Sequence, residues 1–271
     1  MKHYLRSLFL GIALLLVGIS SHVRSSAESS ESPHQTDLTD TLNISRADAK
    51  RGSVLAQTRL CYLLGARTGA PLDNEEAGKW CRLSAEQGHA NSQRLLGKAY
   101  HVGDGGVERD PKEAERWLLA SAKQGNSAAQ VDLGGMYYYG DGVAKNLKKA
   151  VTWYRKSAVQ GNAEAQQMMG FMYDQGYGVL QDDKEAIRWF RMSAEQGNIY
   201  AQNSLGTMYG AGEGVRVDRI YAHMWYNIAA RDGHPALSDN RRNIEKLMTR
   251  DQIIQAQELA KECVKKDYKD C

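Results

Sequence analysis

The sequence predicts an all-α protein, an α-solenoid in which antiparallel helix-loop-helix repeats of about 36 residues stack on one another. Three observations predict it. The spacings between successive tryptophans are 37, 36, 36 and 36 residues. A glycine follows each tryptophan eight residues later. Between these marks, apolar residues recur at helical spacing. The tryptophans are Trp80, Trp117, Trp153, Trp189 and Trp225.

Residues 1–27 have the pattern of a secretory signal peptide. Lys2 and Arg6 form a positively charged region, residues 8–19 are apolar, and small residues follow at 25–27. The apolar run is shorter than the roughly 20 residues that a spanning helix needs, and an uncleaved membrane anchor is the alternative. No cysteine follows the apolar run, so no lipoprotein anchor is expected. We therefore expect a periplasmic or secreted protein.

Cleavage of this leader would leave a neutral chain. The leader holds three of the 35 basic residues and none of the 32 acidic ones. A chain without excess positive charge lacks the electrostatic footprint of a nucleic-acid binder, so no nucleic-acid partner is expected. Residues 28–36 are polar and predict a flexible tether. Residues 37–52 have apolar residues at loosely helical spacing and predict an N-terminal capping helix.

Five repeats are predicted over residues 53–233, at 53–88, 89–125, 126–161, 162–197 and 198–233. In the third repeat, residues 129, 133, 136 and 137 form the apolar face of a first helix. Gly140 and Gly142 then break this helix, Asn146 caps a second one, and Gly161 ends it. In three other repeats an aspartate at the cap is followed three residues later by a glutamate, which predicts capping boxes. These pairs are Asp73 with Glu76, Asp110 with Glu113, and Asp182 with Glu185.

Glycine recurs inside the first helix of repeats two to five, although it costs about 1 kcal/mol there relative to alanine. We expect that the missing side chain lets the tryptophan-bearing helix approach closely. The residues are Gly97, Gly134, Gly170 and Gly206.

The four cysteines of an exported chain favour disulfides. Cys61 holds the helical glycine position in the first repeat, and Cys81 directly follows Trp80, so the two sulfurs should lie on facing helices. Cys263 and Cys271 are close in sequence. We expect the pairs Cys61–Cys81 and Cys263–Cys271. The alternative is four thiols that pack as small apolar groups. The spacings do not resemble a zinc site.

After residue 233 the period stops. Residues 234–271 predict two capping helices, at 236–248 and 250–266, and a capping box of Thr249 with Gln252. These helices are rich in Arg, Lys, Glu and Gln, as the end of a solenoid requires.

The repeats resemble those of the Sel-one-like repeat family, relatives of the tetratricopeptide repeat. The residues that carry the resemblance read AQQMMGFMYDQGYGVLQDDKEAIRWFRMSAEQG at 165–197 and AQNSLGTMYGAGEGVRVDRIYAHMWYNIAARDG at 201–233. The first repeat departs from the pattern, with Cys61 for the glycine and Leu64 for the tyrosine. The resemblance implies a right-handed superhelix, and a role as adaptor or scaffold. Exported bacterial members act in the cell envelope or towards a host, and some cysteine-rich members have been associated with β-lactam binding or hydrolysis.

The search for chemistry gives no catalytic residue, metal site or cofactor. The chain has no HExxH, no SxxK and no GxSxG. Ser238, Asp239 and Asn240 form an SDN tripeptide, which without SxxK indicates no enzyme. His101, near the end of a first helix, is the one histidine that merits a test. The paired loop glycines recur once per repeat and are interpreted as turns.

We predict that the first helices line the concave surface of the solenoid and that a partner binds there. The candidate residues are those that vary while the repeat frame is kept: Arg94, Lys98, His101, Tyr138, Gln167, Phe171, Asp174 and Thr207. Tyr138 and Phe171 are the expected apolar anchors, because aromatic residues dominate interface hot spots. The alternative is an ordinary solvated surface.

The function expected from the sequence is that of a non-enzymatic exported scaffold for a protein or peptide partner, or for a component of the cell envelope. Two alternatives remain open. One is an envelope hydrolase that acts on β-lactams or peptidoglycan. The other is a signalling adaptor held at a membrane by an uncleaved leader.

Overall fold

The structure, a computed structural model, describes residues 45–65, 74–231 and 235–271. The predicted signal peptide, the tether and residues 37–44 of the predicted capping helix lie outside the described residues. All of the described residues belong to one compact unit. Within the described ranges the secondary structure is helical and contains no strand. Residues 45–50 form a helical turn before the first repeat.

Each predicted repeat contains one pair of helices. The first helices are α3 (Val54–Gly65), α5 (Ala90–Val102), α7 (Ser127–Tyr139), α9 (Ala163–Gln175) and α11 (Ile199–Ala211). The second helices are α4 (Asn74–Glu86), α6 (Pro111–Lys123), α8 (Leu147–Ala158), α10 (Asp183–Ala194) and α12 (Arg219–Ala229). Two more helices follow, α13 (Pro235–Glu245) and α14 (Arg250–Lys265).

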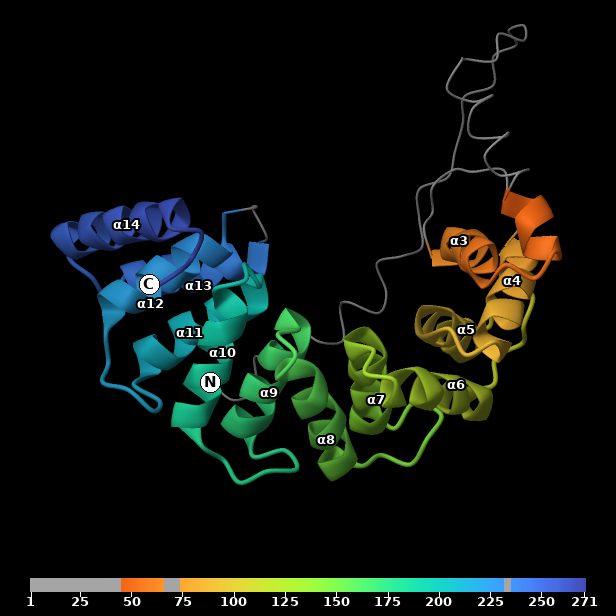
Figure 1. Ribbon diagram of the computed structural model, residues 1–271. Helices are drawn as coiled ribbons and strands as arrows, with labels where there is room; N and C mark the ends of the chain where they lie inside the picture. Colours follow the sequence, from red (N-terminus) through yellow and green to blue (C-terminus); the bar gives the residue numbers. More distant parts are fainter. Residues whose placement is uncertain (1–44, 66–73, 232–234) are drawn as a thin grey trace, which may run out of the picture. The chain divides into compact units, whose positions relative to one another are not determined.

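The helices pack in the order of the chain. Each first helix packs on the second helix of its own repeat, and each second helix packs on the first helix of the next repeat (Figure 1). First helices also meet, α3 with α5 and α9 with α11. At the end of the array, α13 and α14 both pack on α12. This sequential packing of antiparallel pairs is that of an α-solenoid.

Local signals begin and end the helices where the repeat predicts. Asp110, Asn146, Asp182 and Asp218 each accept hydrogen bonds from the first backbone N–H groups of a second helix. First helices end at glycines in the left-handed region, such as Gly140 with φ 74°. Before α5, Nδ1 of His89 accepts from the backbone N–H of Ser92 at 3.4 Å, so this histidine is a cap.

Two of the three predicted Asp–Glu capping boxes are only half formed, and the third includes Asp73, which lies outside the described residues. In α6 and α10 the aspartate caps the helix, but the glutamate does not reach back. Glu113 instead pairs with Arg116 at 2.7 Å, and Glu185 pairs with Arg188 at 3.4 Å. An arginine three residues later on the same face therefore outcompetes the backbone N–H for these carboxylates. The box of Thr249 with Gln252 is complete.

The helical glycines allow the close approach that the sequence predicts. A β-carbon added to Gly134 would lie 2.6 Å from the ring of Tyr154, and one added to Gly170 would lie 2.5 Å from the ring of Phe190. Such distances are far below van der Waals contact. The residue that fills the space is always the one that directly follows the repeat tryptophan. This contact fixes how tightly the two helices of a repeat pack.

A ladder of buried glutamines connects the repeats. In each repeat a first-helix glutamine donates to the carbonyl of an alanine at the end of the preceding second helix, as Gln130 does to Ala122 at 3.1 Å. In repeats one to four, its own amide oxygen accepts from a glutamine at the C-terminal end of the second helix of the same repeat, as Gln130 does from Gln160 at 2.8 Å. Equivalent bonds join Gln57 with Gln87, Gln93 with Gln124, and Gln166 with Gln196. The sequence analysis did not predict this ladder.

The four cysteines form two disulfides, in the pairs expected from the sequence. Cys61 of α3 is bonded to Cys81 of α4, and Cys263 of α14 is bonded to Cys271. Both Cys61 and Cys81 are fully buried. Disulfides of this kind are typical of proteins in oxidising compartments.

Candidate functional site

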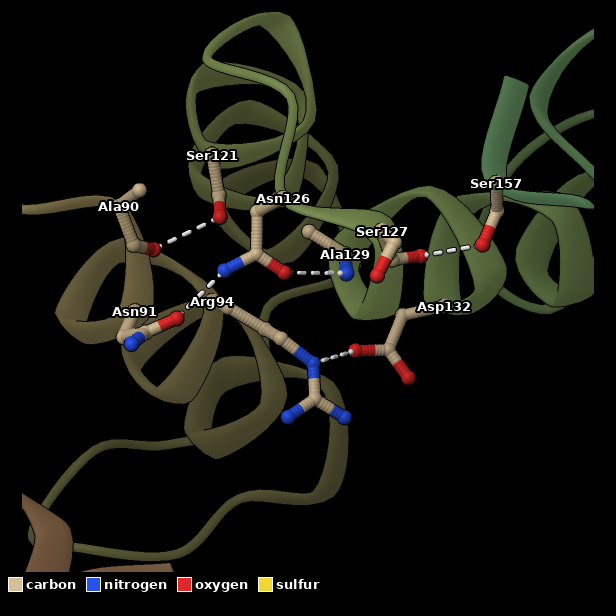
Figure 2. Close-up of polar contacts among 9 residues, drawn as sticks. All are labelled: Ala90, Asn91, Arg94, Ser121, Asn126, Ser127, Ala129, Asp132 and Ser157. Atoms are coloured by element: carbon tan, nitrogen blue, oxygen red, sulfur yellow. Dashed lines mark hydrogen bonds and ion pairs between the residues drawn. The ribbon is translucent and has the colours of Figure 1, made fainter. Parts of the chain in front are cut away.

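The exposed side chains of α5, α7, α9 and α11 form a surface that we call the first-helix face. Polar contacts hold its helices in register (Figure 2). Nε of Arg94 in α5 donates to a carboxylate oxygen of Asp132 in α7 at 2.6 Å. Asn126, which caps α7, donates to Asn91 of α5 at 2.6 Å. The face is therefore held by contacts between repeats.

Serines of the second helices reinforce this register. Oγ of Ser121 donates to the carbonyl of Ala90 at 2.7 Å, and Oγ of Ser157 donates to the carbonyl of Ser127 at 2.8 Å (Figure 2). Ser121 and Ser157 are completely buried, so these bonds are shielded from water. Repeats two and three thus present their first helices in one fixed arrangement.

Four aromatic side chains gather on this face at repeats three and four, and we call them the aromatic cluster: Tyr138, Tyr139, Phe171 and Tyr177. The ring centroid of Tyr138 lies 4.8 Å from that of Tyr139 and 6.3 Å from that of Phe171, both edge to face. Tyr177 lies 5.8 Å from Phe171 and 6.3 Å from Tyr138. Tyr139 is 61% exposed and Tyr177 is 37% exposed. The structure thus brings together the two predicted anchors, Tyr138 and Phe171.

Tyr177 is a member of the cluster that the sequence analysis missed. It lies between the two loop glycines of the fourth repeat, and those glycines were interpreted as a turn. The corresponding loop residues are acidic in the neighbouring repeats, Asp141 in the third and Glu213 in the fifth. The change from an acid to an aromatic residue in one repeat was the signal that could have found it.

His101 belongs to a charged cluster at the edge of the face. Its Nε2 lies 2.8 Å from Oδ2 of Asp141, and Arg109 donates to Oδ1 of the same carboxylate at 2.6 Å. Nε of Arg109 also donates to the backbone carbonyl of His101 at 3.1 Å. These bonds tie the end of α5 to the loop after α7. They hold His101 as a connector between two repeats.

The remaining predicted residues differ in the solvent exposure of their side chains. Lys98 is exposed, and Asp174 is partly exposed. Gln167 is only 8% exposed, so little of its side chain is available to a partner. Oγ1 of Thr207 donates to the carbonyl of Asn203 at 3.2 Å and accepts from the hydroxyl of Tyr226 at 3.1 Å. Thr207 is therefore used in contacts inside its own repeat.

Charge is distributed unevenly over the first-helix face. Helix α5 carries Arg94, Lys98 and His101, whereas α7, α9 and α11 together carry three acidic residues and no basic one. The acidic residues are Asp132, Glu164 and Asp174. Burial raises the pKa of Glu164, and the Asp132 carboxylate raises it further, against the opposing effect of Arg94 and Lys98. Burial also raises the pKa of Tyr138 to about 12, so its hydroxyl remains protonated.

Among the residues that are described, no group of three or more His, Cys, Asp or Glu side chains is arranged to hold a metal ion. No helix in the same ranges is long and apolar enough to cross a membrane.

The fold defines the class of the protein as an α-solenoid of helical-hairpin repeats. The Sel1 repeat family matches residues 54–89, 90–126, 127–162, 163–198 and 199–234. Because these matches cover more than half of the sequence, the chain belongs to the Sel1 repeat family. Each matched repeat starts one residue later than the boundary predicted from the sequence. Members of this family are typically scaffolds for protein–protein interaction.

Two solved structures are similar over most of the chain. One is c5321, described as a protective antigen present in uropathogenic Escherichia coli strains and displaying an SLR fold. It is 34% identical with a TM-score of 0.77, and the match covers 84% of this chain and 50% of that chain. The present chain thus spans about half the length of that antigen. The other is a Sel1 repeat protein from Oxalobacter formigenes, 29% identical with a TM-score of 0.68, covering 84% of this chain and 98% of that one. A search of curated proteins found no match.

Proposed function

We propose that this protein is an exported scaffold that binds a protein or peptide partner on its first-helix face, with the aromatic cluster at the centre of the contact. The observation that carries the proposal is the cluster itself. Tyr139 and Tyr177 are exposed, and they pack on Tyr138 and Phe171, which are only partly buried. Aromatic residues gathered on a rigid surface are typical of interface hot spots.

Preorganisation is the mechanism of this scaffold. The first helices are already held in register by Arg94 with Asp132 and by Asn126 with Asn91. The edge-to-face contacts within the aromatic cluster also fix its rings before a partner arrives. Binding then orders few side chains of the scaffold, and this lowers the entropic cost of association.

An extracytoplasmic location supports a role in the cell envelope or towards a host. Residues 1–27 have the pattern of a signal peptide, and the two disulfides suit an oxidising compartment. The similar structure from uropathogenic E. coli is described as a protective antigen. We propose an extracytoplasmic location for this protein, and a membrane contact only if the leader is not cleaved.

The test is a crosslinking pull-down from the envelope fraction with wild type and with the double variant Tyr138→Ala/Phe171→Ala. We expect the variant to keep its helicity by circular dichroism and to lose capture of the partner. The matched control is Leu83→Ala/Val159→Ala. Leu83 of α4 is 43% exposed and Val159, at the end of α8, is 68% exposed, so this variant removes exposed apolar side chains away from the first-helix face. Equal capture by wild type and the cluster variant would contradict the proposed surface.

A second assay separates the scaffold from the envelope hydrolase. Purified protein is incubated with nitrocefin and with peptidoglycan, and turnover is measured for wild type, His101→Ala and Ser238→Ala. The scaffold predicts no turnover above the protein-free control. Turnover by wild type that either substitution abolishes would overturn the scaffold and support the hydrolase.

A further inference from the structure

Gly135 in α7 is a helical glycine that the packing of the fold does not require. A β-carbon at the adjacent Gly134 would collide with the ring of Tyr154, at 2.6 Å. A β-carbon at Gly135 would meet only one atom within 4 Å, the hydroxyl oxygen of Tyr154 at 3.7 Å, which is an ordinary contact distance. Glycine inside a helix is unfavourable unless something needs its missing side chain. The space beside Gly135 is therefore unexplained by contacts within the protein, and we call it the Gly135 notch.

The repeat shows that the notch is particular to repeat three. The residues at the same position of the other repeats are Tyr62, Lys98, Phe171 and Thr207, and all of them have side chains. Within α7, Asp132 lies one turn before Gly135 and Tyr139 lies one turn after it, on the same side of the helix. The notch therefore lies between an acidic residue and the aromatic cluster.

The hydroxyl of Tyr154 lies at the base of this notch and has no hydrogen-bond partner among the described residues. The side chain is 2% exposed. In repeat five the equivalent Tyr226 donates its hydroxyl to Thr207, the residue that corresponds to Gly135. In repeat four the equivalent residue is Phe190, which has no hydroxyl. A tyrosine hydroxyl that no side chain bonds is available to a group from outside, and this one lies 3.7 Å from the place that the missing β-carbon of Gly135 leaves open.

The surroundings of the notch favour a positive charge. Helices α7 and α9 carry acidic residues, and neither they nor α11 carry a basic one. The carboxylates of Glu164 and Asp132 are both close enough to the Tyr154 hydroxyl to raise its pKa, in addition to the larger effect of burial. Asp132 is already paired with Arg94, and the charges of Arg94 and Lys98 do not offset the burial of Glu164, so Glu164 is the acid for a partner to neutralise. Its own pKa is raised mainly by burial, so a nearby cation would stabilise its charged form.

We propose that the Gly135 notch receives a lysine or arginine side chain of the peptide partner. This inference rests on the proposed function of the first-helix face and names the chemistry that the face selects. The cationic head donates hydrogen bonds to the Tyr154 hydroxyl oxygen and to the Glu164 carboxylate. The methylene stem packs against the aromatic cluster, as the stems of long basic residues pack on apolar surfaces.

The test selects phage-displayed random dodecapeptides on the purified protein and titrates the enriched synthetic peptides by calorimetry. We expect the enriched peptides to share a lysine or arginine, and its replacement by norleucine to raise Kd at least tenfold. Gly135→Leu and Glu164→Gln should also raise Kd at least tenfold, and Tyr154→Phe at least threefold. Gly210→Ala, a helical glycine of α11 with ordinary contacts, is the matched control and should leave Kd unchanged.

The outcomes separate this inference from the proposed function. Peptides whose binding is weakened by Phe171→Ala but not by the variants at Gly135, Tyr154 and Glu164 would overturn the notch and keep the face. Enriched peptides without a shared basic residue would likewise overturn the notch. Binding that responds to neither set of variants, or a selection that enriches no peptide, would count against both.

Discussion

Cys61 of α3 is bonded to Cys81 of α4 at the position where, in each later repeat, a helical glycine lies against a large side chain. In repeat three the equivalent pair is Gly134 with Tyr154. The Cα atoms of the two cysteines are 4.4 Å apart, so the two helices of this repeat also lie close together at this position. A covalent bond therefore replaces the glycine-to-ring contact in the repeat nearest the N-terminal end of the array.

We predict that this disulfide stabilises the first repeat. The bond joins residues 20 positions apart, and closing a loop of that size stabilises a folded protein by about 3 kcal/mol in the chain-entropy model. Cys61→Ala/Cys81→Ala should therefore speed hydrogen exchange in α3 and α4 and leave α9 to α12 unchanged, because each repeat contacts only its neighbours. Equal hydrogen-exchange rates for α3 and α4 in the variant and in wild type would contradict this prediction.

Gly134 and Gly135 provide a prediction from two neighbouring residues. Alanine at Gly134 must displace the Tyr154 ring, and overpacking of this kind costs about 1–3 kcal/mol. Alanine at Gly135 meets no such obstacle and should stabilise the helix by up to about 1 kcal/mol. The free energy of unfolding, measured by urea titration, should thus fall for Gly134→Ala and rise for Gly135→Ala. A Gly134→Ala variant as stable as Gly135→Ala would refute the close approach.

The sequence repeat of about 36 residues made the fold and much of the candidate site predictable. Because each first helix repeats the same inward positions, the residues that vary on it were identified as surface, and Tyr138 and Phe171 do lie together. The close approach at Gly134 was also predictable, since only a packing reason explains a recurrent helical glycine. Its contact residue, Tyr154, became known only from the structure.

The hydrogen bonds of the glutamine and glutamate side chains could not be predicted, because each polar group has several possible partners of similar strength. Glutamines such as Gln130 look like solvated helix residues in a sequence, yet Gln130 is 3% exposed and bonded at both ends of its amide. Gln167, the next residue after another ladder glutamine, was expected at the surface and is largely buried. Glu113 could bond either the backbone or Arg116, and nothing local decides between them.

The glutamine ladder predicts a cost for removing one amide. Gln130→Leu keeps the approximate volume of the side chain but removes the buried hydrogen bond from the Gln130 amide to the carbonyl of Ala122. A buried hydrogen bond lost in this way costs about 1–3 kcal/mol. The urea midpoint of unfolding should therefore fall. Gln255→Leu, an exposed glutamine of α14, is the control and should leave the midpoint nearly unchanged. Equal midpoints for Gln130→Leu and wild type would show that the ladder does not contribute to stability.

The ion pair between Arg46 and Glu76 predicts how the N-terminal end responds to acid. Nε and one terminal nitrogen of Arg46 donate to the two carboxylate oxygens of Glu76, at 2.9 and 2.8 Å. The Arg46 hydrogen bond holds the pKa of Glu76 below its usual value. Since the folded pKa is the lower one, the stabilisation is present above the unfolded pKa of about 4.3 and is lost as pH falls through the folded pKa.

We therefore expect Glu76→Gln to destabilise residues 45–50 and α4 at pH 7 by about 1 kcal/mol, in view of the partial exposure of the pair. The difference from wild type should shrink as the pH falls from 5 to 3, measured by the urea dependence of hydrogen exchange in these segments. Glu258→Gln is the matched control. The hydrogen bond from Lys261 lowers the pKa of Glu258 as well, but this carboxylate is fully exposed. Removing the Glu258 carboxylate should change the free energy of unfolding little at any pH. A loss of stability in Glu76→Gln that does not depend on pH would contradict the prediction and show that the pair contributes packing and not charge.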